Sequence, residues 1–199
     1  MDDNAGNRHR QQDRDLYVQA REQDGYFTAA QARAVGFSVA DVGAAIVAGS
    51  WVPVEPGLYR LTQWRSTDLE EVARCCVWFD DAVVSHQSAA ELHGLGSLHP
   101  QFLHVTALTE MYHRMDRVAV HRSALAFSDC EHTGSFRITT PLRTVLDLAG
   151  GGVSQWVLDE VVGDGFAIGR LDRGALEAAL TGCSAHVNQR IGRALRTTF

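Results

Sequence analysis

The chain has 199 residues, 45% of them hydrophobic, and a formal net charge of −6 from 18 basic and 24 acidic residues. Every basic residue is an arginine, so the sequence excludes a P-loop, a lysine Schiff base and any nuclease that depends on a catalytic lysine. The acidic balance lacks the basic surplus typical of DNA-binding domains, and no apolar run approaches membrane-spanning length.

The chain begins with a polar, charged stretch. Residues 1–12 are predicted to form a disordered tail, and a helix is expected over about residues 13–23. Thr28 and Gln31 then have the spacing of a capping box, which predicts the start of a short helix. Gly36 suits the left-handed position at which this short helix ends.

A second helix is predicted after a tight turn, with Ser38 as its N-cap and Gly49 at its end. Its core-facing side is predicted to contain Val39, Val42 and Ile46. Its outward side is predicted to contain Ala40, Asp41, Ala44 and Ala48. None of these outward residues binds guanine bidentately, and Asp41 repels phosphate.

A β-hairpin follows, with strands expected at residues 51–54 and 58–61. Glu55-Pro56-Gly57 has the residues of a type II turn, and Pro53 predicts that its strand lies at an edge. Residues 13–66 thus show the order helix, turn, helix and hairpin. This order predicts a winged helix-turn-helix domain, which lays one helix in the DNA major groove.

The residues expected to contact DNA are Arg33, Ser38, Arg60 and Arg65, with Arg8, Arg10 and Arg14 of the tail. Strand alternation is expected to turn Arg60 outward on the wing. A second interpretation stays open because the second helix has no basic residue. In that interpretation the winged unit is structural and its alanine-rich helix packs on a protein partner.

Residues 67–199 are predicted to form a mixed α/β domain with helices on a small sheet, which makes the whole chain α+β. Strands are expected at residues 82–84, 102–108, 117–122 and within 129–139. Helix N-caps are predicted at Thr67, Ser85, Thr140, Ser154 and Asp172. A last, basic helix is expected over residues 188–197.

Five segments together resemble the AbiEi-like antitoxins: GYFTAAQARAVGFS, PGLYRL, VVSHQSAAELHGL, FLHVTAL and RITTPLRTVLDLA. The resemblance covers about residues 25–180, and its most specific residues are Ser85, His86, His93, Thr140, Arg143 and Asp147. It implies a bacterial protein with an N-terminal winged helix that represses its operon. It also implies a C-terminal α/β domain that counters a nucleotidyltransferase-like toxin. Family members commonly have an arginine-rich second helix, which this chain lacks.

The polar residues of the C-terminal part favour structural roles. His86 and His93 are seven residues apart on one predicted helix, about 10 Å along its axis, which is too far to share a metal ion. Arg143 and Asp147 have i,i+4 spacing, and we expect an ion pair that holds the fold. A surface contact with toxin or nucleic acid is the alternative for this pair.

The sequence therefore predicts an antitoxin-type transcriptional regulator without enzymatic activity, cofactor or metal. Its expected partners are double-stranded operator DNA and a nucleotidyltransferase-like toxin, countered directly or indirectly, with no membrane. The four cysteines form no CxxC pair and the first fifteen residues show no signal peptide, which favours the cytoplasm. The alternative function is a protein-interaction antitoxin module whose winged helix does not read DNA.

Overall fold

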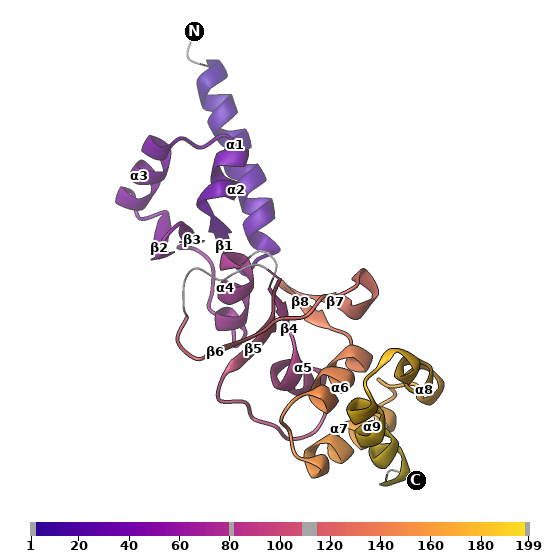
Figure 1. Ribbon diagram of the computed structural model, residues 1–199. Coiled ribbons are helices and arrows are strands. Elements are labelled where there is room, and N and C mark those ends of the chain that lie inside the picture. Colours follow the sequence, from indigo (N-terminus) through magenta and orange to yellow (C-terminus); the bar gives the residue numbers. More distant parts are fainter. Residues whose placement is uncertain (1–2, 80–81, 109–114, 198–199) are drawn as a thin grey trace. The chain divides into compact units, whose positions relative to one another are not determined.

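The computed structural model describes residues 3–79, 82–108 and 115–197. Over these residues the protein is α+β, with helices and two small sheets (Figure 1). This agrees with the fold class that the sequence predicts. Within the described residues, no helix is both long enough and apolar enough to cross a membrane.

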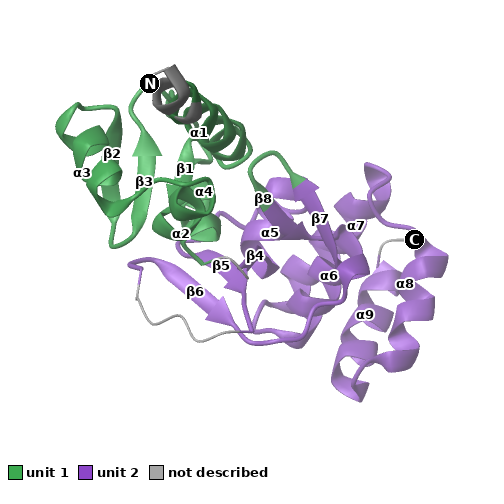
Figure 2. Ribbon diagram, turned by 90° about the horizontal axis from the view of Figure 1, so that it is seen from above, with its two compact units in different colours: residues 1–80, 133–136 green, residues 81–132, 137–199 purple. Residues whose placement is uncertain are grey.

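Residue contacts divide the chain into two compact units (Figure 2). The first unit comprises residues 1–80 and 133–136, and the second comprises residues 81–132 and 137–199. The sequence places the boundary earlier, after residue 66.

The first unit contains four helices and one antiparallel sheet among its described residues, with strand order β1-β3-β2. Its elements are α1 (Asp3–Arg21), β1 (Tyr26–Thr28), α2 (Ala29–Ala34), α3 (Val39–Val47), β2 (Trp51–Glu55), β3 (Leu58–Leu61) and α4 (Glu70–Trp78). Strand β1 is not expected from the sequence, because three residues are too few to show an alternating pattern.

The turns and caps predicted for α2, α3 and the hairpin of this unit are confirmed. Thr28 and Ser38 each form a complete capping box at the start of α2 and α3. Gly36 and Gly57 have positive φ values of 105° and 76°, which glycine adopts without steric cost. Pro53 lies in β2, an edge strand, where no ladder needs its missing N–H.

The N-terminal tail differs from the prediction. Helix α1 begins at Asp3, so the backbone is helical over most of the segment predicted to be disordered. The second half of α1 packs on the core of the unit, because Leu16 and Ala20 belong to the buried cluster that contains Phe27 and Trp51. The rings of Phe27 and Trp51 meet edge to face with centroids 4.8 Å apart, a favourable geometry for aromatic pairs.

Helix α4 packs on the opposite face of the small sheet. Ala73 and Val77 of this helix form a second buried cluster with Tyr26 of β1 and Leu58 of β3. The three-stranded sheet is therefore covered on both faces, and α4 belongs to the first unit. The predicted capping box at the start of α4 is wrong, because Thr67 donates its hydroxyl to Asp24 instead (2.8 Å).

The second unit is built on a five-stranded sheet with order β6-β5-β4-β8-β7. Its strands are β4 (Val83–Val84), β5 (Leu103–Thr106), β6 (Val118–His121), β7 (Cys130–Thr133) and β8 (Phe136–Thr139). Strand β4 pairs parallel with β8 and antiparallel with β5, while β5 pairs parallel with β6. The sheet is thus mixed, because it contains both parallel and antiparallel pairs.

Helices form the main core of the second unit. They are α5 (His86–His93), α6 (Pro141–Gly150), α7 (Gln155–Ala167), α8 (Arg173–Ala179) and α9 (Ala185–Thr197), with 3-10 turns η1 (Phe127–Asp129) and η2 (Leu180–Gly182). Their buried leucines, valines and alanines form one continuous cluster. The N-caps predicted at Thr140, Ser154 and Asp172 are confirmed. The last helix begins earlier than predicted, at Ala185.

Candidate functional site

Helix α3 is the helix that the sequence predicts to be the reading helix of a winged helix-turn-helix. Its inward side packs Val42, Ala45 and Ile46 against the core of the first unit. Val39 and Val47 are 86% and 90% exposed, so the prediction that Val39 faces the core is wrong. Val39 is the first residue of α3, directly after its N-cap, whereas the residues of α3 that pack on the core come from its later turns.

At the start of α3, the side chains of Ser38 and Asp41 form the capping hydrogen bonds of the helix. Ser38 Oγ donates to Asp41 Oδ2 (2.6 Å) and accepts from the Asp41 backbone N–H (3.2 Å). The same carboxylate accepts from the Ser38 backbone N–H (2.8 Å). These hydrogen bonds from Ser38 lower the pKa of Asp41 below its usual value, so the carboxylate stays charged where a phosphate would approach.

Arg60 does not point to solvent, and the prediction that its side chain is exposed on the wing is wrong. Its Nη1 donates to Glu70 Oε1 (2.9 Å), its Nη2 donates to the carbonyl oxygen of Arg65 (3.0 Å), and its side chain is 14% exposed. Its Cζ atom lies 5.1 Å from the centroid of the Tyr26 ring, as in a cation–π contact. Alternation along β3 does turn Arg60 away from the aromatic core, but α4 covers that second face.

Arg60 belongs to a network that holds α4 on the sheet. The Tyr26 hydroxyl donates to the same Glu70 oxygen (2.9 Å). Burial, and then the hydrogen bond to Glu70, raise the pKa of Tyr26 to about 12. A hydrogen bond from Ser66 is the largest of the effects that lower the pKa of Glu70. The network thus keeps a charged carboxylate against the Arg60 guanidinium.

The other arginines that are predicted to contact DNA are exposed, except where the side chain is not described. Arg33 lies in the last turn of α2 and is exposed, and so are Arg65, Arg10 and Arg14. The hydrogen bond between Arg65 and Arg60 involves only the backbone carbonyl of Arg65. Arg8 lies in a part of α1 whose side chains fall outside the described set.

In the second unit, three histidines that are distant in sequence form one stack. The ring of His86 lies 3.5 Å from that of His121, centroid to centroid, at an interplanar angle of 13°. His104 Nδ1 lies 2.9 Å from His121 Nε2, a hydrogen-bond distance that requires one of the two nitrogens to be unprotonated. Burial, and then the nearby His121 and His104, lower the pKa of His86 to about 3.

Ser85 is the N-cap residue of α5, as predicted, but its side chain makes no capping hydrogen bond and contacts the stack instead. Its Oγ accepts from Thr106 Oγ1 (2.8 Å) and lies 3.0 Å from His86 Nδ1. His86 itself has a positive φ of 51°, a strained conformation for a residue with a Cβ. Among the described residues, no group of three or more histidine, cysteine or carboxylate side chains is arranged to hold a metal ion.

His93 lies at the other end of α5 and acts as an anchor. Its Nε2 lies 2.7 Å from the carbonyl oxygen of Thr139 in β8, and its Nδ1 lies 3.0 Å from Arg170 Nη2. Arg170 in turn donates to Glu131 (2.8 Å). The side chain of His93 therefore joins α5 to β8, and the structure does not bring it to His86.

Arg143 ties α6 to the segment before β7. Its Nε donates to Asp147 Oδ1 (2.8 Å), which confirms the predicted ion pair. Its Nη1 donates to Asp129 Oδ2 (2.7 Å), and its Nη2 donates to Ser123 Oγ (2.8 Å). Burial raises the pKa of Asp147, and the Arg143 guanidinium opposes this effect.

Sequence reasoning did not identify four of these partners: His104, His121, Ser123 and Asp129. They come from strands and loops that only the sheet pairing brings beside His86 and Arg143. In the sequence His104 and His121 are isolated histidines on two predicted strands. Their stacking with His86 can be foreseen only once the pairing of β5 with β6 is known.

No family model matches the sequence, and no curated protein matches it either. A solved structure is similar: the crystal structure of the RV2827C protein from Mycobacterium tuberculosis. It has 14% sequence identity and a TM-score of 0.56, over 92% of this chain and 75% of that chain. At this identity the likeness concerns the fold alone.

Proposed function

We propose that the protein is the antitoxin of a toxin–antitoxin pair and that it represses its own operon by binding operator DNA. In this proposal the first unit is a winged helix-turn-helix domain, and the second unit counters a nucleotidyltransferase-like toxin. The protein is a cytoplasmic regulator, not an enzyme.

The element order of the first unit is the observation that carries the proposal. A strand follows α1, two short helices follow the strand, and the hairpin of β2 and β3 completes a sheet with β1 at the other edge. A winged helix-turn-helix has the same order, with α3 as the reading helix. The resemblance to AbiEi-like antitoxins in the motif residues of the second unit supports the antitoxin part.

DNA contact in this proposal falls to exposed arginines around α3 and not to the wing. Arg33 and Arg65 remain available, while Arg60 is engaged by Glu70. Because α3 itself is apolar, base reading would rest on shape and on methyl groups of thymine more than on bidentate hydrogen bonds.

Binding to the DNA upstream of the chain's own reading frame tests the repressor. Fluorescence anisotropy with that duplex and with a shuffled duplex, at low and at physiological salt, measures specificity directly. We expect the native duplex to bind more tightly at both salt concentrations. Equal binding to both duplexes that disappears at physiological salt contradicts the repressor, because it is purely electrostatic.

A second function is favoured by one specific observation, the apolar exposed side of α3. Val39 and Val47 flank small residues on that side, and no basic residue accompanies them. In this alternative the first unit contacts a protein partner and does not read DNA.

Ala44→Glu separates the two functions, because Ala44 is exposed on α3 and the change should leave the fold intact. Loss of operator binding with intact growth rescue from the toxin favours the repressor. Loss of rescue with unchanged operator binding favours the interaction module. Ala178→Glu, at an exposed alanine of α8, is the matched control and should change neither property.

A further inference from the structure

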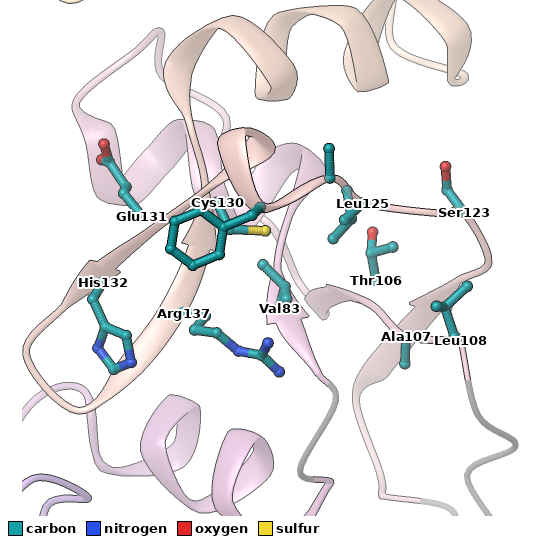
Figure 3. A pocket seen from close by; sticks show the side chains of 12 residues that line it. Val83, Thr106, Ala107, Leu108, Ser123, Leu125, Cys130, Glu131, His132 and Arg137 are labelled. Carbon is teal, nitrogen blue, oxygen red and sulfur yellow. The ribbon is translucent and has the colours of Figure 1, made fainter.

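Two pockets of the protein differ in the charge of their linings. A pocket of about 420 Å³ lies on the five-stranded sheet of the second unit, and Glu131 and Arg137 are among the residues that line it (Figure 3). Glu131 forms an ion pair with Arg170 at 2.8 Å, and Arg137 is not free either. These two side chains therefore indicate no charge for a ligand. A pocket of about 480 Å³ in the first unit is different.

The pocket of the first unit is lined by α1, by the junction of α3 with β2 and by the end of β3. Leu16 and Trp51, which are 2% and 5% exposed, supply apolar surface. Thr62 holds the junction in place, because its Oγ1 donates to the Gly49 carbonyl (2.7 Å) and its N–H donates to the Ser50 carbonyl (3.0 Å). A lining that is fixed before a ligand arrives lowers the entropy lost on binding.

Asp13 of α1 gives this pocket a negative charge. Among the described residues of the lining, Asp13 is the one ionised side chain, and no arginine or histidine accompanies it. Asp13 is exposed, and within the described part of the chain no ion pair or side-chain hydrogen bond engages it. Arg10 and Arg14 of the same helix lie outside the lining. The charge of the carboxylate is therefore not compensated within the pocket.

The C-terminal end of α3 adds to this negative charge. Gly49 and Ser50 line the pocket, and they directly follow Ala48, the C-cap of this nine-residue helix. The C-terminal end of a helix carries roughly half an elementary negative charge, which a basic residue in the last turn commonly offsets. The last turn of α3 contains no basic residue. Both the helix end and Asp13 thus favour a cation.

Tyr17 adds an aromatic ring to the same side of the pocket. It follows Asp13 by four residues on α1, so the two side chains are neighbours on one face of the helix. Tyr17 is 42% exposed and lines the pocket. A carboxylate beside an aromatic ring is a common environment of ammonium and guanidinium groups, because both the carboxylate and the face of the ring attract positive charge.

We propose that this pocket binds a small organic cation, with an ammonium or guanidinium head against Asp13 and Tyr17 and an alkyl stem over Leu16. The volume is in the range of small-molecule sites. Arg33 and Arg65, the proposed DNA contacts, do not line the pocket. The inference therefore goes beyond the proposed function and gives the protein a small-molecule ligand.

Titration of the full chain with pentylamine, which is protonated at neutral pH, tests the site, and 1-pentanol is the neutral analogue of the same shape. NMR shift changes of the backbone amides measure both dissociation constants. We expect the amine to bind with a dissociation constant on the order of 1 mM, as ligands of this small size do. The alcohol should bind roughly fivefold more weakly, because it lacks the charged contact.

Three variants locate the cation. Asp13→Asn should weaken pentylamine to the level of the alcohol and should keep the fold, because Asp13 is exposed. Asp15→Asn is the matched control and should bind pentylamine as the parent does. It removes the same charge from the same helix, but Asp15 accepts a hydrogen bond from Gln11 and does not line the pocket. Tyr17→Leu should weaken the amine about two- to fivefold and leave the alcohol nearly unchanged.

Three results overturn the proposal. The first is the absence of amide shifts with pentylamine up to several tens of millimolar, with a folded chain. The second is equal affinity for the amine and the alcohol, which shows that the pocket does not select positive charge. The third is equal affinity of Asp13→Asn and Asp15→Asn for pentylamine, which places the cation elsewhere.

Discussion

At the scale of single residues, Arg60 shows how a side chain predicted to contact DNA has a structural role instead. Its position in β3 and its charge made it the best phosphate contact on the predicted wing. In the structure its guanidinium is shared between Glu70 and the Arg65 carbonyl, beneath α4. The residue therefore contributes to stability, and its effect on DNA binding is indirect.

Arg60→Ala should lower the free energy of unfolding by about 1–3 kcal/mol, because it removes the guanidinium that donates to the half-buried Glu70 carboxylate. Urea denaturation measures the change. Arg65→Ala, at an exposed position whose side chain makes none of these contacts, is the control and should stay within about 0.5 kcal/mol. Equal stability of both variants would show that the network with Tyr26 and Glu70 does not hold α4.

The stacked histidines predict a stability that falls on acidification. The folded pKa of His86 is about 3, below its usual value of 6.5, so the unfolded chain binds a proton that the folded chain does not. The contribution of His86 to stability is then complete above pH 6.5 and is lost progressively as the pH falls from 6.5 toward 3. His104, His121 and Arg143 face the ring and all oppose its protonation. His86 alone should account for about 1–2 kcal/mol between pH 7.5 and 5.

His86→Asn tests this pH dependence, because asparagine tolerates the positive φ at this position. Its free energy of unfolding should vary less between pH 7.5 and 5 than that of the parent. His186→Gln, at an exposed position of α9, should keep the parental slope. An unchanged slope in His86→Asn would mean that the stack does not exclude protons.

At the scale of elements, α6 is fastened to the chain before β7 by one side chain. The guanidinium of Arg143 reaches Asp147, Asp129 and Ser123, which lie in a helix, a 3-10 turn and a loop. The helix propensity of the α6 sequence accounts for the helix, but not for its place. The position of α6 in the fold depends on the Arg143 guanidinium, whose N–H donors point in several directions.

Arg143→Met should lower the free energy of unfolding by about 3–5 kcal/mol, since it leaves the buried Asp147 without its partner. Amide exchange at residues 123–129 should also accelerate, because the bonds to Ser123 and Asp129 are lost. Arg193→Met, at an exposed arginine of α9, is the control. Parental exchange rates in Arg143→Met would show that other contacts hold the segment.

At the scale of the whole molecule, the charge balance limits any DNA binding. The net charge is −6, and α3 has no basic residue. In the proposed interface the phosphate contacts fall to the exposed Arg33 and Arg65. A protein with few such contacts binds DNA with a shallow dependence on salt.

Arg33→Ala and Arg65→Ala should each reduce the slope of log K against log salt concentration by about one, as one phosphate contact is lost. Anisotropy titrations over a salt series measure the slope. Arg193→Ala should leave it unchanged. Parental slopes in both variants would remove these arginines from the proposed interface.

The sequence by itself determined several local features of this protein. The capping boxes at Thr28 and Ser38, the turn at Gly57 and the cap at Thr140 follow from contacts within a few residues, so the residue types predict them. The tertiary structure alone decided which surfaces remain free. Helix α4 covers the face that carries Arg60, and the pairing of β5 with β6 brings His104 and His121 to His86. Such contacts join residues far apart in the chain, and local periodicity records only which side a residue faces, not what covers that side.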